Sequence, residues 1–196
     1  MSSVRTLTLA DLAAPRAGFL PNALLILGAS VATALAARIA LPVPWSPVPI
    51  TGQTFAVLLT GAVLGARRAL LAQALYLAEG ALGLPVFAAG AAGLAQIAGP
   101  SGGYLIAFPF AAALTGALAE HGWDRRFATM LAAMLLGSAV IFALGLIQLS
   151  RFMPGARLLA AGLLPFVPGD LIKSTLAALA FPTAWRFAHR RGGIDA

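Results

Sequence analysis

Six apolar stretches run along the chain, separated by short segments rich in proline, glycine and arginine. They cover residues 23–41, 52–64, 69–84, 104–119, 127–149 and 170–187. A helix that crosses a bilayer needs about 20 predominantly apolar residues. The pattern therefore predicts a single all-α integral membrane domain, residues 1–196, with six transmembrane helices of which the second is short.

The composition supports a place in the membrane. Hydrophobic residues make up 60% of the chain and charged residues only 10%, and the mean hydropathy is +0.92. Soluble domains carry about 25% charged residues. A secretory signal peptide is the rival interpretation of the first apolar stretch, but this stretch is longer than a signal core and leads into further membrane segments. We therefore expect a retained helix and a multi-pass protein of the cell (inner or plasma) membrane.

The arginines predict which side of the membrane each loop occupies. Nine fall in one set of loops and termini, namely Arg5, Arg16, Arg67, Arg68, Arg125, Arg126, Arg186, Arg190 and Arg191, whereas the opposite set holds Arg151 and Arg157. By the positive-inside rule both termini are cytoplasmic, with residues 1–22 as an N-terminal segment and residues 188–196 as a tail. The net charge of +7 does not indicate nucleic-acid binding, because the arginines are scattered and do not gather on one face.

The residue types exclude several functions. The chain has no cysteine, and its two histidines lie in terminal or loop segments, so we expect no disulfide, no metal site and no cofactor. Ser101 falls in an outer loop while His121 and His189 fall on the cytoplasmic side, so no nucleophile and base come together. We expect no catalytic residue and no enzyme. The outer loops 42–51 and 85–103 carry no charge, and they are either lids over a cavity or ordinary connectors.

The ionisable residues Asp170 and Lys173 stand out because they lie among apolar residues. Charged groups at membrane depth are costly and usually face a partner, a cavity or a ligand. Their three-residue spacing puts them on one face of a helix, and Asp170 follows Pro168-Gly169 as a helix-starting residue would. A lysine beside free helix N–H groups can receive a carboxylate. The alternative is that the two side chains neutralise each other.

Two other features of the apolar stretches predict contacts with other helices or side chains. Small residues at three- and four-residue spacing, Ala29, Ala32, Ala36 and Ala40, form a smooth stripe on the first predicted helix. Such stripes allow close helix packing, either inside the bundle or against another protein. Arg38 and Glu79 are isolated charges at similar predicted depths, and we hypothesise that they form an ion pair.

Four segments in order resemble members of the BioY family, the biotin-binding S components of energy-coupling-factor (ECF) transporters. They are Pro47-Val48-Pro49-Ile50-Thr51-Gly52-Gln53-Thr54, Leu75-Tyr76-Leu77 with residues 80–87, residues 99–105, and residues 164–173. The resemblance extends from about Ala23 to Arg186. It implies a six-helix S-component fold that captures biotin from outside for vitamin uptake.

The resemblance also implies roles for individual residues. Lys173 would bind the biotin carboxylate, and Asp170 would accept a ureido N–H or orient Lys173. The other implied biotin-binding residues are Gln53 and Tyr104 at the ends of loops, and Phe87, Gly90 and Gly93 in a loop that covers the ligand.

Partners follow from the same resemblance. A transmembrane T component and two ATP-binding cassette subunits would supply energy, and ATP would be used by those subunits. The T component would meet the alanine stripe, and a homo-oligomer is also open. The alternatives are a stand-alone transporter of biotin or a small carboxylate, and a membrane scaffold that binds no ligand.

Overall fold

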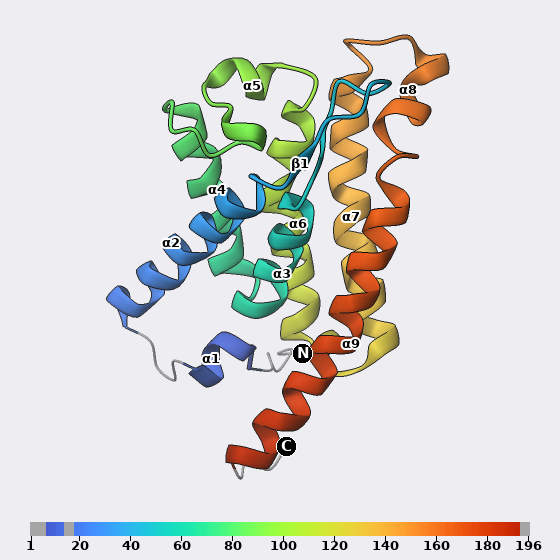
Figure 1. The fold of residues 1–196 in the computed structure, drawn as a ribbon. Coiled ribbons are helices and arrows are strands. Elements are labelled where there is room, and N and C mark those ends of the chain that lie inside the picture. Colours follow the sequence, from blue (N-terminus) through green and yellow to red (C-terminus); the bar gives the residue numbers. More distant parts are fainter. Residues whose placement is uncertain (1–6, 14–17, 193–196) are drawn as a thin grey trace, which may run out of the picture.

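The computed structural model describes residues 7–13 and 18–192, and it is a bundle of helices (Figure 1). The elements in chain order are α1 (Leu9–Ala13), α2 (Phe19–Ala36), β1 (Ala40–Leu41), β2 (Ile50–Thr51), α3 (Gln53–Leu64), α4 (Ala66–Ala81), the 3-10 helix η1 (Ala88–Gly90), α5 (Leu94–Ala98), α6 (Gly102–Glu120), the 3-10 helix η2 (Trp123–Arg125), α7 (Phe127–Leu149), α8 (Gly155–Gly162) and α9 (Val167–Gly192). Each predicted apolar stretch contains a helix.

The first and last predicted helices have different boundaries in the structure. Helix α2 ends at Ala36, and Ala40 pairs with Thr51 in a small antiparallel hairpin. The prediction that Ala40 continues the helical stripe is therefore wrong. Residues 40 and 41 are instead extended and pair with Thr51 and Ile50 of β2, and Pro42 favours this extended conformation at Leu41. Helix α9 continues to Gly192, past the predicted start of the tail at residue 188.

Helix α9 also begins earlier than predicted. Its first turn includes Pro168, whose missing N–H costs nothing there because the first N–H groups of a helix have no partner within it. Asp170 is consequently not the starting residue: its backbone N–H already donates to Phe166 O at 2.9 Å. Lys173 lies one turn further on, so the free N–H groups at the helix start are not beside it.

Among the residues that the structure describes, four helical segments are long and apolar enough to cross a membrane, namely α2, α6, α7 and the segment from α8 through α9. Helix α3, with 12 residues, is about 18 Å long and shorter than a bilayer core. Helix α1 and the C-terminal end of α9 lie at one end of the bundle, opposite the β1–β2 hairpin, α5 and α8 (Figure 1). The six-crossing count and the cytoplasmic side stay predictions.

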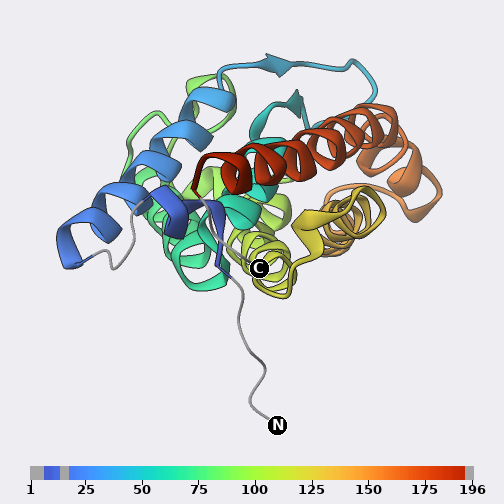
Figure 2. The same cartoon turned by 90° about the horizontal axis from the view of Figure 1, so that it is seen from below.

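Helix α6 forms the centre of the bundle, and 67% of the residues in its most apolar 18-residue stretch are buried. Glycines let its neighbours approach: a Cβ on Gly61 of α3 would collide with Ala112 O, and one on Gly103 would collide with Leu144 O of α7. Helix α2 lies at the rim (Figure 2), and only 11% of its 18 residues are buried. This peripheral helix leaves most of its apolar side chains for lipid or another protein.

The hypothesised ion pair between Arg38 and Glu79 is wrong. Arg38 donates to Pro85 O at 2.8 Å, and Glu79 accepts a 2.6 Å hydrogen bond from Ser30. The two charges therefore bind neutral groups. Glu79 joins α4 to α2, whereas Arg38 anchors the loop that follows α4.

Candidate functional site

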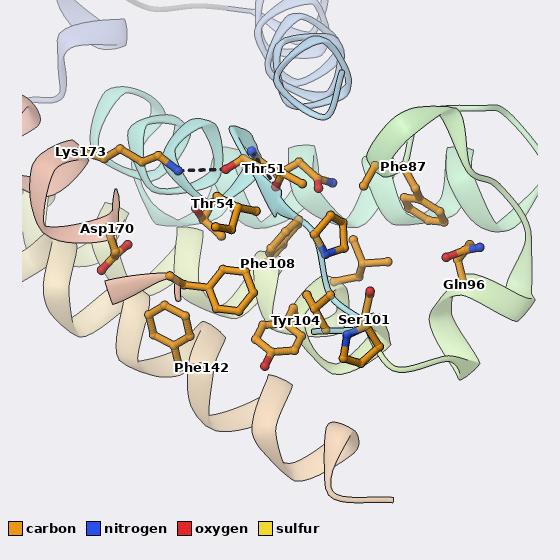
Figure 3. Close-up of a pocket in the computed structure, with 18 residues that line it drawn as sticks. Thr51, Thr54, Phe87, Gln96, Ser101, Tyr104, Phe108, Phe142, Asp170 and Lys173 are labelled. Carbon is orange, nitrogen blue, oxygen red and sulfur yellow. Dashed lines mark hydrogen bonds between the residues drawn. The ribbon is translucent and has the colours of Figure 1, made fainter. Parts of the chain in front are cut away.

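A cavity lies among the β1–β2 hairpin, α3, α6, α7, α9 and the loop after α4 (Figure 3). Its volume of about 170 Å³ is more than ten times the roughly 10–15 Å³ that one water needs. The lining residues are Pro47, Val48, Pro49, Ile50, Thr51, Gln53, Thr54, Phe87, Ala88, Gln96, Ser101, Tyr104, Leu105, Phe108, Phe142, Phe166, Asp170 and Lys173. Both uncharged loops contribute residues, as the lid interpretation expects.

The two acidic and basic residues that line the cavity, Asp170 and Lys173, come from α9, and each is held by a separate hydrogen bond. Lys173 Nζ donates to the backbone oxygen of Thr51 at 2.9 Å. Ser138 of α7 donates to Asp170 Oδ1 at 2.7 Å. Both side chains are half-buried, and they form no ion pair with each other. Direct neutralisation is therefore not their arrangement, and both keep bonding capacity for a ligand.

Five aromatic side chains line the cavity, together with prolines and aliphatic residues. The ring centroid of Phe166 lies 6.3 Å from that of Tyr104 and 6.3 Å from that of Phe142. A second group places Tyr76 against Phe87 at 5.6 Å and against Phe108 at 6.3 Å. Rings at these separations pack favourably. The cavity can thus hold a flat apolar body, with charged groups on α9.

The structure brings five of the seven predicted biotin-binding residues to the cavity: Asp170, Lys173, Gln53, Tyr104 and Phe87. The Tyr104 hydroxyl donates to Gly162 O at 2.7 Å, so its remaining capacity is that of an acceptor. The other two predicted residues, Gly90 and Gly93, do not line the cavity. They have φ values of +82° and +89°, which glycine adopts readily, and they shape the loop that carries Phe87.

Several lining residues escape prediction from the sequence. Phe142 lies in the middle of an apolar helix and looks like any lipid-facing residue. Ser138 acts beneath the cavity surface, and the backbone oxygen of Thr51 has no side-chain signature. Phe166 and Tyr76, however, belong to segments that resemble known relatives (residues 164–173 and 75–77), so position within those segments was a usable signal.

Comparison with known proteins identifies the family. The model of the BioY family matches residues 7–190. The chain belongs to the BioY family. Among its BioY relatives, the biotin transporter BioY of Thermotoga maritima is 43% identical over 138 residues, covering 70% of this chain and 80% of the relative. The biotin transporter BioY of Rhizobium etli is 41% identical over 141 residues, covering 68% and 75%.

A solved structure shows the same fold. The crystal structure of the S-component for biotin from an ECF-type ABC transporter superposes with a TM-score of 0.73 at 26% identity, covering 85% of this chain and 92% of that one. The chain is thus an all-helical, multi-pass membrane protein with the S-component fold of the BioY family. This is a family of transporter components and not of enzymes.

Proposed function

We propose that this chain is the substrate-binding subunit of a biotin uptake transporter. The observation that carries the proposal is the placement of Lys173 and Asp170, separately held, on one side of an aromatic-walled cavity. Biotin combines a carboxylate, an apolar body and a ureido group with two N–H donors. A mostly apolar pocket with a few polar anchors suits such a ligand. The names of the BioY relatives and of the matched S-component support the same substrate.

Lys173 is assigned to the carboxylate. An ammonium group has three donors, and one is used on Thr51 O, which leaves two for a carboxylate. Asp170 uses one oxygen for Ser138. Its other oxygen can accept a ureido N–H, and its charge can also hold the ammonium of Lys173 in place.

The test is equilibrium binding of biotin and biotin methyl ester to the purified protein in detergent. The parent is expected to bind biotin tightly and the ester at least about tenfold more weakly, because the ester lacks the charge that Lys173 pairs with. Lys173→Ala should bind both ligands with the same reduced affinity. A well-folded parent that binds no biotin would overturn the proposal.

The proposed partners are a T component and two ABC-type ATPase subunits. The matched structure comes from an ECF-type ABC transporter, which supports an energy-coupling module over a stand-alone transporter. Uptake of labelled biotin by cells that carry the chain with and without the module separates the two. Uptake only with the module is expected, and equal uptake without it would establish the stand-alone alternative.

We place the partner contact on α2, around its exposed small residues. Gly28 and Ala32 are exposed, whereas Ala29 and Ala36 are partly buried, and a Cβ on Gly52 would lie 2.8 Å from Ala36 O. Part of the predicted stripe therefore packs inside the bundle, and part of it, at Ala32, is exposed. Ala32→Leu is expected to leave biotin binding intact and to reduce uptake. If Ala32→Leu lowers binding by the purified subunit, or if the subunit forms a homo-oligomer through α2, this assignment is wrong.

A further inference from the structure

Two consecutive hydrogen bonds link buried residues beside the cavity. Gln53 Nε2 donates to the Tyr76 hydroxyl at 2.6 Å, and that hydroxyl donates to Val86 O at 2.9 Å. Tyr76 is fully buried at 0% exposure and Gln53 is 3% exposed. These hydrogen bonds join the start of α3, the middle of α4 and the loop that carries Phe87.

The direction of both hydrogen bonds follows from donor and acceptor chemistry. A backbone carbonyl can only accept, and a tyrosine hydroxyl has one hydrogen to give. The Tyr76 hydrogen is therefore used on Val86 O, and toward Gln53 its oxygen can only accept. The amide of a glutamine is assigned from its hydrogen-bond partners. Here those partners require that Nε2, and not Oε1, faces Tyr76.

This orientation of the Gln53 amide determines the position of its oxygen, Oε1. Within the described ranges, no hydrogen bond uses Gln53 Oε1, and the Gln53 side chain lines the cavity. We propose that Tyr76 is a positioning residue for specificity, which holds the Gln53 amide so that Oε1 accepts an N–H from the ligand. This role rests on the proposed function, and it selects ligands with a cyclic-urea type of donor.

The surroundings of Tyr76 suit a fixed orientation. Its ring meets the edge of Phe87 and stacks on Phe108. Gly80 leaves the space that the Phe87 ring occupies, since a Cβ there would collide with that ring. The aromatic packing holds the phenol ring, so the hydroxyl group alone sets the orientation of the amide.

The test compares the dissociation constants of biotin and of its two mono-N-methyl ureido isomers. The parent is expected to prefer biotin to the isomer whose methyl group replaces the N–H facing Gln53. Tyr76→Phe keeps the ring and frees the amide to turn. It should reduce that preference about three- to tenfold, the range of one neutral hydrogen bond.

Rescue separates positioning from a structural role. Both carboxylate oxygens of a glutamate are acceptors in either orientation. Adding Gln53→Glu to Tyr76→Phe should therefore restore the preference for biotin. The matched control is Thr33→Val, which removes the hydroxyl that accepts from the buried Gln73 Nε2 at 3.0 Å, away from the cavity. It should leave the preference unchanged.

The outcomes distinguish failure of the proposed biotin-binding function from failure of the positioning role of Tyr76. If the parent binds no biotin, the proposed function fails and this inference fails with it. If Tyr76→Phe weakens biotin and both isomers by the same factor, without rescue, only the positioning role is overturned. Should Tyr76→Phe not fold, Gln53→Glu alone must keep the preference and Gln53→Leu must lose it, and any other result contradicts the proposal.

Discussion

Two aspartates, one within α9 and one packed against it, have very different surroundings. Asp170 lies near the start of the helix and lines the cavity. Asp124 of η2 contacts Trp185, which is 15 residues or about 22 Å further along the same helix. Asp124 is 0% exposed and accepts a 2.5 Å hydrogen bond from the Trp185 indole. It also lies 3.3 Å from Arg125 Nε.

The difference shows what separates a structural carboxylate from one that is available to a ligand. Burial raises the pKa of Asp124, while the Trp185 indole and Arg125 oppose that rise. The Arg125 guanidinium carbon lies 3.5 Å from the centre of the Trp185 ring, and Arg125 donates to Leu7 O at 3.0 Å. These contacts leave the Asp124 carboxylate covered by protein. Asp170 and Lys173 have one hydrogen bond each and a cavity beside them. We therefore assign stability to the Asp124 cluster, made of Asp124, Arg125 and Trp185, and ligand binding to the end of α9 that lines the cavity.

The largest effect is expected from a substitution that removes Asp124 from its contacts with Trp185 and Arg125. Asp124→Ala removes a buried carboxylate, its hydrogen bond from Trp185 and its ion pair with the partly exposed Arg125, and should lower the free energy of unfolding by about 2–4 kcal/mol, with biotin affinity unchanged in the folded protein. Chemical unfolding in detergent measures the first and equilibrium binding the second. Asp124→Asn keeps an acceptor for the indole and should cost less. Loss of affinity in folded Asp124→Ala would contradict the assignment.

Lys173→Ala tests the opposite end. Loss of the charged partner should weaken biotin binding by about 2–4 kcal/mol, roughly 30- to 1,000-fold, while the free energy of unfolding changes by less than about 1 kcal/mol. Arg157→Ala is the matched control because Arg157 is an exposed cation of α8 that does not line the cavity. Equal affinities in Lys173→Ala and the parent would remove Lys173 from the site.

Gly80→Ala sharpens the comparison by moving an aromatic wall. The added methyl group collides with Phe87, and overpacking of this kind costs about 1–3 kcal/mol. The displaced ring should weaken biotin binding about tenfold. Gly28→Ala is the control, since nothing lies within 4 Å of a Cβ there. Unchanged binding in Gly80→Ala would show that the Phe87 ring does not shape the site.

The smallest effect is expected from Ser138→Ala. It removes the hydrogen bond to Asp170, worth about 1 kcal/mol, and should weaken biotin binding several-fold in the same assay. Thr175→Val removes an exposed hydroxyl on α9 that bonds within its own helix and should have no effect. If both variants behave alike, Ser138 does not orient Asp170.

The sequence predicted much of this arrangement where single residues carry a strong signal. Each apolar stretch located a helix, and isolated charges drew attention to Asp170 and Lys173. Contacts that depend on backbone atoms far away in the chain were out of reach. Arg38 donates to Pro85 O and does not pair with Glu79, and Lys173 donates to Thr51 O. Because every residue has a carbonyl oxygen, the sequence does not indicate which one a cation will bind.

Loop geometry was equally hidden. The hairpin that takes Ala40 out of the first helix depends on pairing with Thr51. Gly90 and Gly93 resemble ligand-contacting glycines in sequence but have turn conformations. The role of Tyr76 depends on two hydrogen bonds made together, to a residue of α3 and to a loop carbonyl, which no spacing along one helix reveals.

The most direct test of the account is the unfolding temperature measured with and without saturating biotin in the parent, Lys173→Ala and Asp124→Ala. A ligand stabilises the folded state in proportion to the logarithm of its concentration over its dissociation constant. We expect biotin to raise the unfolding temperature of the parent by several degrees. Lys173→Ala should keep the ligand-free value and lose the rise, whereas Asp124→Ala should lose the ligand-free value and keep the rise. A parent without any rise, or a rise lost in Asp124→Ala and kept in Lys173→Ala, would contradict the account.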